Sequence, residues 1–351
     1  MFSHETVRPQ SVSALQATNW EFWPPWLFYA PVAAFVAALG VRYGWSALPA
    51  ANPGLQDGGL VGESKFEILR LLPPEWTIAS LLLPAGTSPA VASIEIATRG
   101  WSYPLVAKPD IGQRGVGVKR LHNEGELAKY LESFGGAVLI QPWHPGPFEA
   151  GIFYARWPGV ATGQIFSITD KRFPVLAGDG RSTIEQLIRR HPRFSKQAAT
   201  FLRRHDGRRG DILGHGETMV LGEVGNHAQG AMFVDGAQLI TSALEQRIDT
   251  IARHVPGFFV GRFDVRYHDL HAFVAGRDLA IVELNGVTAE STNIYDPSHT
   301  LVEAYATLFK QWHLVFRIGA ANLARGVQRV RRRRLVKLAW DHLTDRRTFP
   351  V

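Results

Sequence analysis

Two short stretches near the C-terminal end of the chain alternate between apolar and polar residues, as β-strands do. They are FVGRFDVRY (259–267), which carries Asp264, and LAIVELN (279–285), which carries Glu283 and Asn285. The alternation and the β-branched content predict two strands, and the segment between them can close a hairpin. Glu283 and Asn285 are two positions apart, so their side chains leave the same face, where Asp264 can join them.

Two carboxylates and an amide oxygen form a set of hard oxygen donors. Such a set suits Mg²⁺ that is held together with substrate phosphates. The alternative is a surface hairpin whose acidic side chains face water, and these residues alone do not separate the two interpretations.

A second pattern, YPLVAKPDIGQRGVGVKRL (103–121), predicts a strand that ends at Lys108, a loop with three glycines, and a return strand. Glycines allow backbone N–H groups to approach a phosphate closely, and the lysine adds a positive charge. The loop matches neither GxxxxGK[ST] nor the dinucleotide fingerprint. Its combination with the strand pair, within one domain length, favours a phosphate-and-metal site. The loop glycines are Gly112, Gly115 and Gly117.

On these residues the chain resembles the ATP-grasp superfamily, and within it the D-alanine–D-alanine ligase-like and cyanophycin synthetase-like members. The resemblance implies an α/β (α+β) fold in which two lobes clamp ATP. It implies that Lys108 contacts the α- and β-phosphates, and that Arg262 meets the transferring phosphoryl group or a tetrahedral centre. The residues that match the family's D…E-x-N ligands for Mg²⁺ or Mn²⁺ are Asp264, Glu283 and Asn285.

The resemblance extends to the nucleotide pocket. VLIQPWHPGPFEAGI (138–152) looks like the hinge strand over adenine, with Gln141 and Trp143 at the adenine edge and Glu149 near the ribose-binding glutamate. GESKFEIL (62–69) looks like the family's earlier lysine segment, with Lys65 at the start of a helix.

Other segments match on the substrate side. VLAGDGRSTIEQLI (175–188) is close to the GDG-x-[ST] segment of cyanophycin synthetase-like domains, and GNHAQGA (225–231) resembles the N-x-x-x-G stretch that follows it. The resemblance implies that Arg172, Asn226 and His227 face the substrate. His227 is either a proton shuttle or an ordinary polar histidine.

The chain also departs from the D-alanine ligases. Gly286, Val287 and Thr288 stand where those enzymes have a Ser-Pro-Gly turn, and only about 60 residues precede Lys65, too few for their preceding domain. The resemblance therefore implies nucleotide and metal chemistry, but not a substrate.

Three functions remain open. The first is an ATP- and Mg²⁺-dependent ligase that joins a small-molecule or peptide carboxylate to an amine through an acyl phosphate. The second is a small-molecule kinase of the same superfamily, and the third is a nucleotide-binding protein without turnover. The intact lysine and metal-type residues disfavour the third, and family frequency favours the ligase.

Composition agrees with a globular enzyme and narrows the chemistry. The chain has 351 residues, 46% of them hydrophobic and 20% charged, and no cysteine. Thiolate metal sites and disulfides are thereby excluded, and the absence of HExxH and GxSxG motifs argues against zinc proteases and serine hydrolases.

The net charge of +7 is concentrated in GVQRVRRRRLVKLAWDHLTDRR (326–347). This segment is either a solvated basic helix or a contact for anionic lipid, and we expect no nucleic-acid partner.

The segment WPPWLFYAPVAAFVAALGV (23–41) is uncharged, but its prolines leave too short a helix to cross a bilayer. Aromatic residues in and around it, including Trp20, Trp23, Trp26 and Tyr29, resemble membrane-interface anchors. It is either an anchor on an anionic membrane surface or a helix packed on the core.

We expect a cytoplasmic protein with an N-terminal segment (1–60), a small lobe (61–140), a large lobe (141–320) and a basic tail (321–351).

Overall fold

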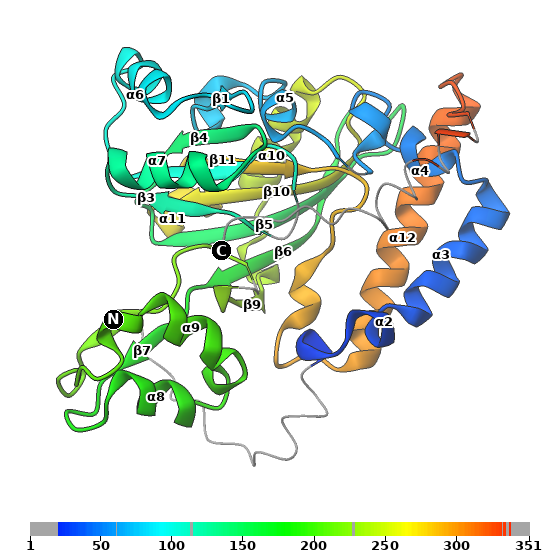
Figure 1. The fold of residues 1–351 in the computed structure, drawn as a ribbon. Helices are drawn as coiled ribbons and strands as arrows, with labels where there is room; N and C mark the ends of the chain where they lie inside the picture. The colour runs from blue at the N-terminus through cyan, green and yellow to red at the C-terminus, as the bar shows by residue number, and fades with distance from the viewer. Residues whose placement is uncertain are drawn as a thin grey trace.

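The structure, a computed structural model, describes residues 20–60, 62–112, 115–226, 229–331, 333, 334 and 337. In these ranges the chain forms a four-stranded sheet, a five-stranded sheet and a two-stranded ribbon, with helices packed around them (Figure 1). The pairings between the named strands are all antiparallel. The fold is therefore a mixed arrangement of helices and antiparallel sheets.

The four-stranded sheet forms a small lobe with its own core. Helices α6 (Pro89–Thr98) and α7 (Glu124–Ser133) bury Ile96 and Leu127 against Leu105 and Ile140 of the sheet. Asn123 begins α7, because its side chain accepts a hydrogen bond from the Glu126 N–H at 3.0 Å. The strands, in sheet order, are β1 (Leu81–Leu83), β4 (Val138–Pro142), β2 (Leu105–Pro109) and β3 (Lys119–Leu121).

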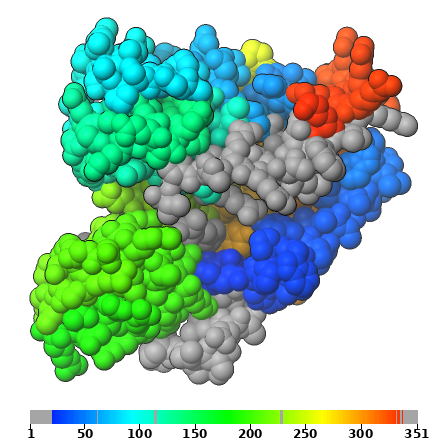
Figure 2. All heavy atoms as spheres, viewed as in Figure 1, coloured from blue at the N-terminus to red at the C-terminus, as the bar shows by residue number. Residues whose placement is uncertain are grey.

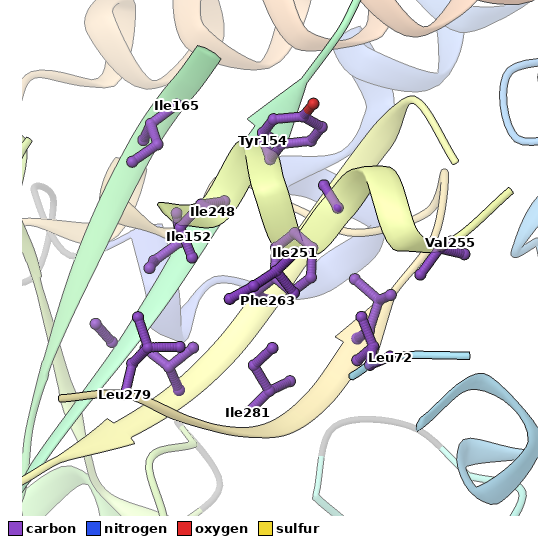
Figure 3. Packing of buried hydrophobic residues seen from close by; sticks show 14 of the residues in the cluster. Leu72, Ile152, Tyr154, Ile165, Ile248, Ile251, Val255, Phe263, Leu279 and Ile281 are labelled. Carbon is purple, nitrogen blue, oxygen red and sulfur yellow. The ribbon is translucent and has the colours of Figure 1, made fainter. Parts of the chain in front are cut away.

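The five-stranded sheet forms the large lobe, and its two faces differ. One face is apolar and packs against α10 (Ser242–His254), with Ile152, Phe263 and Ile281 on the sheet and Ile248 on the helix (Figure 3). Because side chains alternate along a strand, the intervening residues point to the opposite face. The strands, in order, are β11 (Ala280–Asn285), β10 (Val260–Tyr267), β5 (Phe148–Ala155), β6 (Gln164–Arg172) and β9 (Met232–Asp235).

A separate subdomain follows β6. The ribbon of β7 (Val175–Ala177) and β8 (Thr218–Val220) packs with α8 (Ile184–Arg190) and α9 (Ala198–Arg204) around its own apolar cluster. The GDG segment forms the turn into α8, where Asp179 accepts hydrogen bonds from Ser182 N at 2.6 Å and Ser182 Oγ at 2.7 Å. In this structure the GDG residues therefore shape a turn.

The apolar segment near the N-terminus forms α2 (Pro25–Phe28) and α3 (Ala30–Tyr43), which pack along α12 (Leu301–Ala324) (Figure 1). Pro31 lies in the first turn of α3, where a missing N–H costs nothing. Phe28 stacks on Tyr305 at 5.4 Å between ring centres. Across the described ranges, no helix combines the length and apolar character needed to cross a bilayer.

The remaining elements are short. The α-helices are α4 (Ala47–Ala50), α5 (Lys65–Leu69) and α11 (Leu270–Val274), and single 3-10 turns lie at Trp20–Phe22, Gln56–Gly58, Pro74–Trp76, Phe194–Gln197, Asp206–Arg208, Ala237–Leu239 and Thr292–Tyr295. Helix α11 lies in the connection between β10 and β11, so the predicted hairpin is confirmed with a helical turn inside it.

Candidate active site

The polar face of the large sheet gathers the predicted metal-type residues. Strands β10 and β11 pair so that Asp264 lies opposite Glu283, and Arg262 lies opposite Asn285. Cross-strand partners share a face, as do residues two apart, so these four side chains project together. Gly151 of β5 pairs with Asp264, and a Cβ there would lie 3.1 Å from Arg262 Cδ. The glycine leaves room for the charged pair.

Asp264 is a buried carboxylate surrounded by cations. Arg262 donates from Nε to Oδ1 at 2.9 Å and from Nη2 to Oδ2 at 3.0 Å, and Lys171 Nζ lies 3.1 Å from Oδ1. Burial alone would raise the pKa of Asp264, but the two cations outweigh it and hold that pKa at about 2. Asp264 is therefore ionised at neutral pH.

Lys171 is a site residue that the sequence reasoning missed. It lies on β6, is buried, and donates to Glu149 Oε1 at 2.9 Å as well as contacting Asp264. Burial would lower the pKa of Lys171, but the two carboxylates raise it. The strand carried a signal, because Ser167, Thr169 and Lys171 are two positions apart and residues two apart along a strand share a face.

Lys108 links the two lobes. It lies on β2 of the small lobe, and its Nζ donates to Val282 O of β11 at 2.9 Å. Burial lowers its pKa to about 8, against the attraction of Glu283 and Asp264. The predicted phosphate-binding lysine and the predicted metal residues thus meet in one place.

Lys65 and the glycine loop lie beside Lys108. Lys65 Nζ donates to the carbonyl oxygens of Gly112 at 2.7 Å and Asp110 at 3.2 Å, so in this structure it orders the start of the loop. Gly115 and Gly117 both have positive φ angles, at 68° and 76°. A Cβ on Gly115 would lie 2.1 Å from Asn226 Nδ2, so the loop and Asn226 meet closely.

Among the described residues, the buried amide nitrogen of Asn226 has no hydrogen-bond partner, while its Oδ1 accepts from Gln229 N at 2.7 Å. An unpaired buried donor beside the glycine loop is suited to an acceptor on a ligand. His227 lies outside the described residues. Arg172 is exposed, pairs with Asp170 at 3.1 Å, and does not line the cavity.

The expected adenine region lies where β4 of the small lobe leads into β5 of the large lobe. Gln141 Nε2 donates to Ser80 Oγ at 2.9 Å. Two guanidinium groups lie over the ring of Trp143, with Arg120 at 4.4 Å and Arg266 at 4.2 Å from its centre. The tryptophan is thereby fixed in orientation.

Glu149, expected near the ribose, is buried in ion pairs. Besides Lys171, Arg266 Nε donates to its Oε2 at 3.3 Å. Both carboxylate oxygens thus accept from cations within the sheet.

Of the predicted site residues, all but Gly117, Arg172 and the undescribed His227 line one cavity of about 950 Å³ between the lobes, and so does Lys171. Its walls include Glu63, whose pKa is raised to about 7 by burial and by the neighbouring Asp57 and Glu283, against the effect of Lys65. The sequence reasoning did not single out this carboxyl group, although it lies two positions before Lys65.

The donor set at the end of this cavity fits a hard divalent cation. The carboxylates of Asp264 and Glu283 and the amide oxygen of Asn285 could supply oxygen ligands. Asn285 lies beside Asp264, because its Nδ2 donates to Asp264 Oδ2 at 3.3 Å. In the described part of the chain there is no cluster of three or more His, Cys, Asp or Glu side chains that could hold a metal. The set therefore depends on the asparagine as its third member.

No protein-family model matches the chain, and no curated protein matches it. Solved structures with a similar arrangement include a bifunctional glutathione synthetase from Pasteurella multocida (15% identity, TM-score 0.36), a D-Ala:D-Ser ligase from Enterococcus faecalis (14%, 0.38) and a D-alanine–D-alanine ligase from Bacillus anthracis (15%, 0.40). The matches cover 70%, 71% and 72% of this chain, and 36%, 61% and 68% of those proteins. A D-alanine–D-alanine ligase is thus among the similar structures, as the motifs led us to expect, but likenesses this weak assign no activity and no substrate.

Proposed function

We propose that this chain is an ATP-grasp-type ligase that uses ATP to join a carboxylate to an amine. The observation that carries the proposal is the meeting of Lys108 from the small lobe with Asp264 and Glu283 from the large lobe at one cavity. Phosphoryl transfer requires positioning and charge neutralisation more than a covalent group on the protein. This cavity supplies both.

The proposed reaction has two steps. A carboxylate oxygen of the acid attacks the γ-phosphorus of ATP, the bond to the β–γ bridging oxygen breaks, and ADP leaves with the electron pair. The amine nitrogen then attacks the acyl carbon, the bond to phosphate oxygen breaks, phosphate leaves, and the nitrogen loses a proton.

The roles of the residues follow from their chemistry. Lys108 neutralises phosphate charge, and the backbone at Gly115 and Gly117 covers the phosphates. Arg262 provides positive charge where an oxyanion develops. Asp264, Glu283 and Asn285 would hold Mg²⁺, which neutralises charge on the phosphates when bound.

Hydroxylamine trapping tests the ligase assignment. In the presence of ATP, Mg²⁺ and a pool of carboxylic acids, we expect the protein to form a hydroxamate, because hydroxylamine intercepts an acyl phosphate as a small amine would. Colorimetric detection of the hydroxamate and coupled detection of ADP measure the two products. A stable phosphorylated alcohol as the sole product would assign the chain to the kinases instead, and ATP binding without ADP release would assign it to non-catalytic nucleotide binders.

We further propose that the outer face of α2 and α3 rests on an anionic membrane surface. The inner face packs on α12, but Trp26, Val41 and Trp45 are 74%, 84% and 49% exposed on the outside. The chain after α12 returns to the same end of α3, where Ser46 Oγ donates to Val330 O at 3.3 Å (Figure 1). Exposed basic side chains gather at this end, namely Arg42, Arg329, Arg331 and Arg333. Apolar burial and charge complementarity would act together there.

Liposome co-sedimentation tests this contact. We expect wild-type protein to bind phosphatidylserine vesicles at low salt, and Val41→Asp to lose most of this binding because a charge enters the apolar contact. Ile94→Asp is the matched control, since Ile94 is 65% exposed on α6, in the small lobe. Equal sedimentation of all three proteins, or none by the wild type, would refute the membrane contact.

A further inference from the structure

The cavity has a second half that the nucleotide and metal chemistry does not use. Its walls come from the first described residues and from residues 295–312, and they are largely aromatic. The cavity-lining aromatic residues of this half, called here the aromatic half, are Trp20, Trp23, Phe28, Tyr29, Tyr295 and Trp312.

The aromatic half is a fixed part of the fold. Trp20 Nε1 donates to Ile294 O at 3.1 Å, and Tyr305 donates to Phe28 O at 2.9 Å. Glu21 pairs with Arg193, which ties the start of this segment to the α8–α9 subdomain; the segment (dark blue) and the subdomain (green) touch in Figure 2. These contacts hold the wall in place before a ligand enters.

The aromatic half opens directly onto the charged half. Tyr29 donates to Glu290 Oε2 at 2.7 Å and lies 2.8 Å from the Tyr295 hydroxyl, while Arg262 Nη1 donates to the Glu290 carbonyl oxygen at 2.9 Å. Glu290, which bounds the aromatic half, is therefore held by Arg262, the same arginine that binds Asp264. A ligand with a polar head at Arg262 would extend its body between the rings.

We propose that the aromatic half binds the body of the acid substrate, and that this substrate is an amphipathic carboxylic acid with an aryl or alkyl body. The inference rests on the proposed ligase function for the role of the carboxylate. A small polar acid would leave the rings in contact with water, whereas an apolar body would displace that water favourably. The cavity volume, near the upper end of the ~300–1,000 Å³ typical of small-molecule sites, leaves room for such a body beside a nucleotide.

Two tryptophans three positions apart provide a matched test. Trp23 is partly buried and lines the cavity, whereas Trp26 is 74% exposed and does not. We would measure the binding of 3-phenylpropionate, decanoate and acetate to the full chain by calorimetry, without ATP. We expect the first two to bind and acetate to bind at least tenfold more weakly, since it buries almost no apolar surface.

Trp23→Ala should weaken 3-phenylpropionate binding about tenfold or more, while Trp26→Ala leaves it unchanged. The affinity for Mg·ATP should be the same in both variants, which verifies that Trp23→Ala is folded. If Trp23→Ala does not fold, Trp23→Gln tests the same contact with a polar side chain of intermediate size. Equal affinity for acetate and 3-phenylpropionate, or binding that is insensitive to both Trp23 substitutions, would overturn the proposal.

This experiment separates the inference from the proposed function. Binding of the apolar acids that depends on Trp23, together with no ADP release, would support the pocket and count against the ligase. ADP release with small polar acids only, without measurable binding of the apolar acids, would support the ligase and overturn the pocket.

Discussion

Glu283→Gln should lower ADP-producing turnover by about 100-fold or more, with little change in folding. The amide keeps the shape of the side chain but removes one of the two carboxylate charges that face each other across β10 and β11. A divalent cation held there would bind more weakly, and the phosphate charge would be less well neutralised. Steady-state ADP release at several Mg²⁺ concentrations measures the effect.

Glu67→Gln is the control for this experiment. Glu67 is an exposed glutamate on α5 that pairs with Arg70 at 3.2 Å and does not line the cavity. We expect the control variant to retain wild-type turnover. If Glu283→Gln were also close to wild type, Glu283 would have no metal role.

Lys108→Ala should weaken Mg·ATP binding by about 10- to 100-fold, which corresponds to a charge-assisted hydrogen bond of roughly 1.5–3 kcal/mol. The pKa of Lys108 is lowered to about 8, so its ammonium group is protonated at pH 7, where titration calorimetry should be done. A phosphate bound beside the ammonium would favour the charged form further.

Lys119→Ala controls for the loss of a lysine from the same hairpin. Lys119 is exposed on β3 and does not line the cavity, so we expect its removal to leave nucleotide affinity within about twofold of the wild type. If Lys108→Ala bound Mg·ATP as tightly as the wild type, Lys108 would have no role on phosphate. Its role would then be to link the two lobes through its hydrogen bond to Val282 O.

The parts of the site that the sequence predicted are those set by local pattern. Alternation along 279–285 places Glu283 and Asn285 on one face, and alternation along 259–267 allows Asp264 to join them. The pairing of β10 with β11 brings the three side chains together. The glycine hairpin likewise placed Lys108 at a strand end, where β2 has it. The alternation of side chains along a strand and the residue preferences of a turn depend on positions close together in the chain, so both can be predicted directly from the sequence.

The parts that the sequence did not predict depend on partners from distant strands. Lys171 joins Asp264 only because β6 pairs with β5 and β5 with β10, a register that no single segment contains. The same pairing gives Glu149 two cationic partners, Lys171 and Arg266, instead of leaving its carboxylate open. The family resemblance assigned Lys65 to the earlier lysine segment of the nucleotide pocket. Its hydrogen bond to the Gly112 carbonyl oxygen, at 2.7 Å, could not be predicted from residues 62–69 alone.

The aromatic half could not be predicted for a similar reason. Trp23 and Trp26 belong to one uncharged segment whose composition resembles a membrane anchor along its whole length. Only the packing of α2 and α3 on α12 divides it, so that Trp23 faces the cavity and Trp26 faces outward. Composition reports the character of a segment, whereas the division into two faces is decided by where its partner helix lies.

The hydrogen bond from Trp20 to Ile294 spans 274 positions, and this separation affects how the molecule is made. The entropy of closing a chain grows only with the logarithm of its length, so the bond adds little to the thermodynamic cost. Contacts between distant segments nevertheless form slowly, and α2 and α3 leave the ribosome long before α12 exists to receive them. During synthesis their inner face remains without its partner, so we expect this face to be the surface that needs protection from aggregation. The first described residues of the chain are therefore among the last to take their places in the cavity wall.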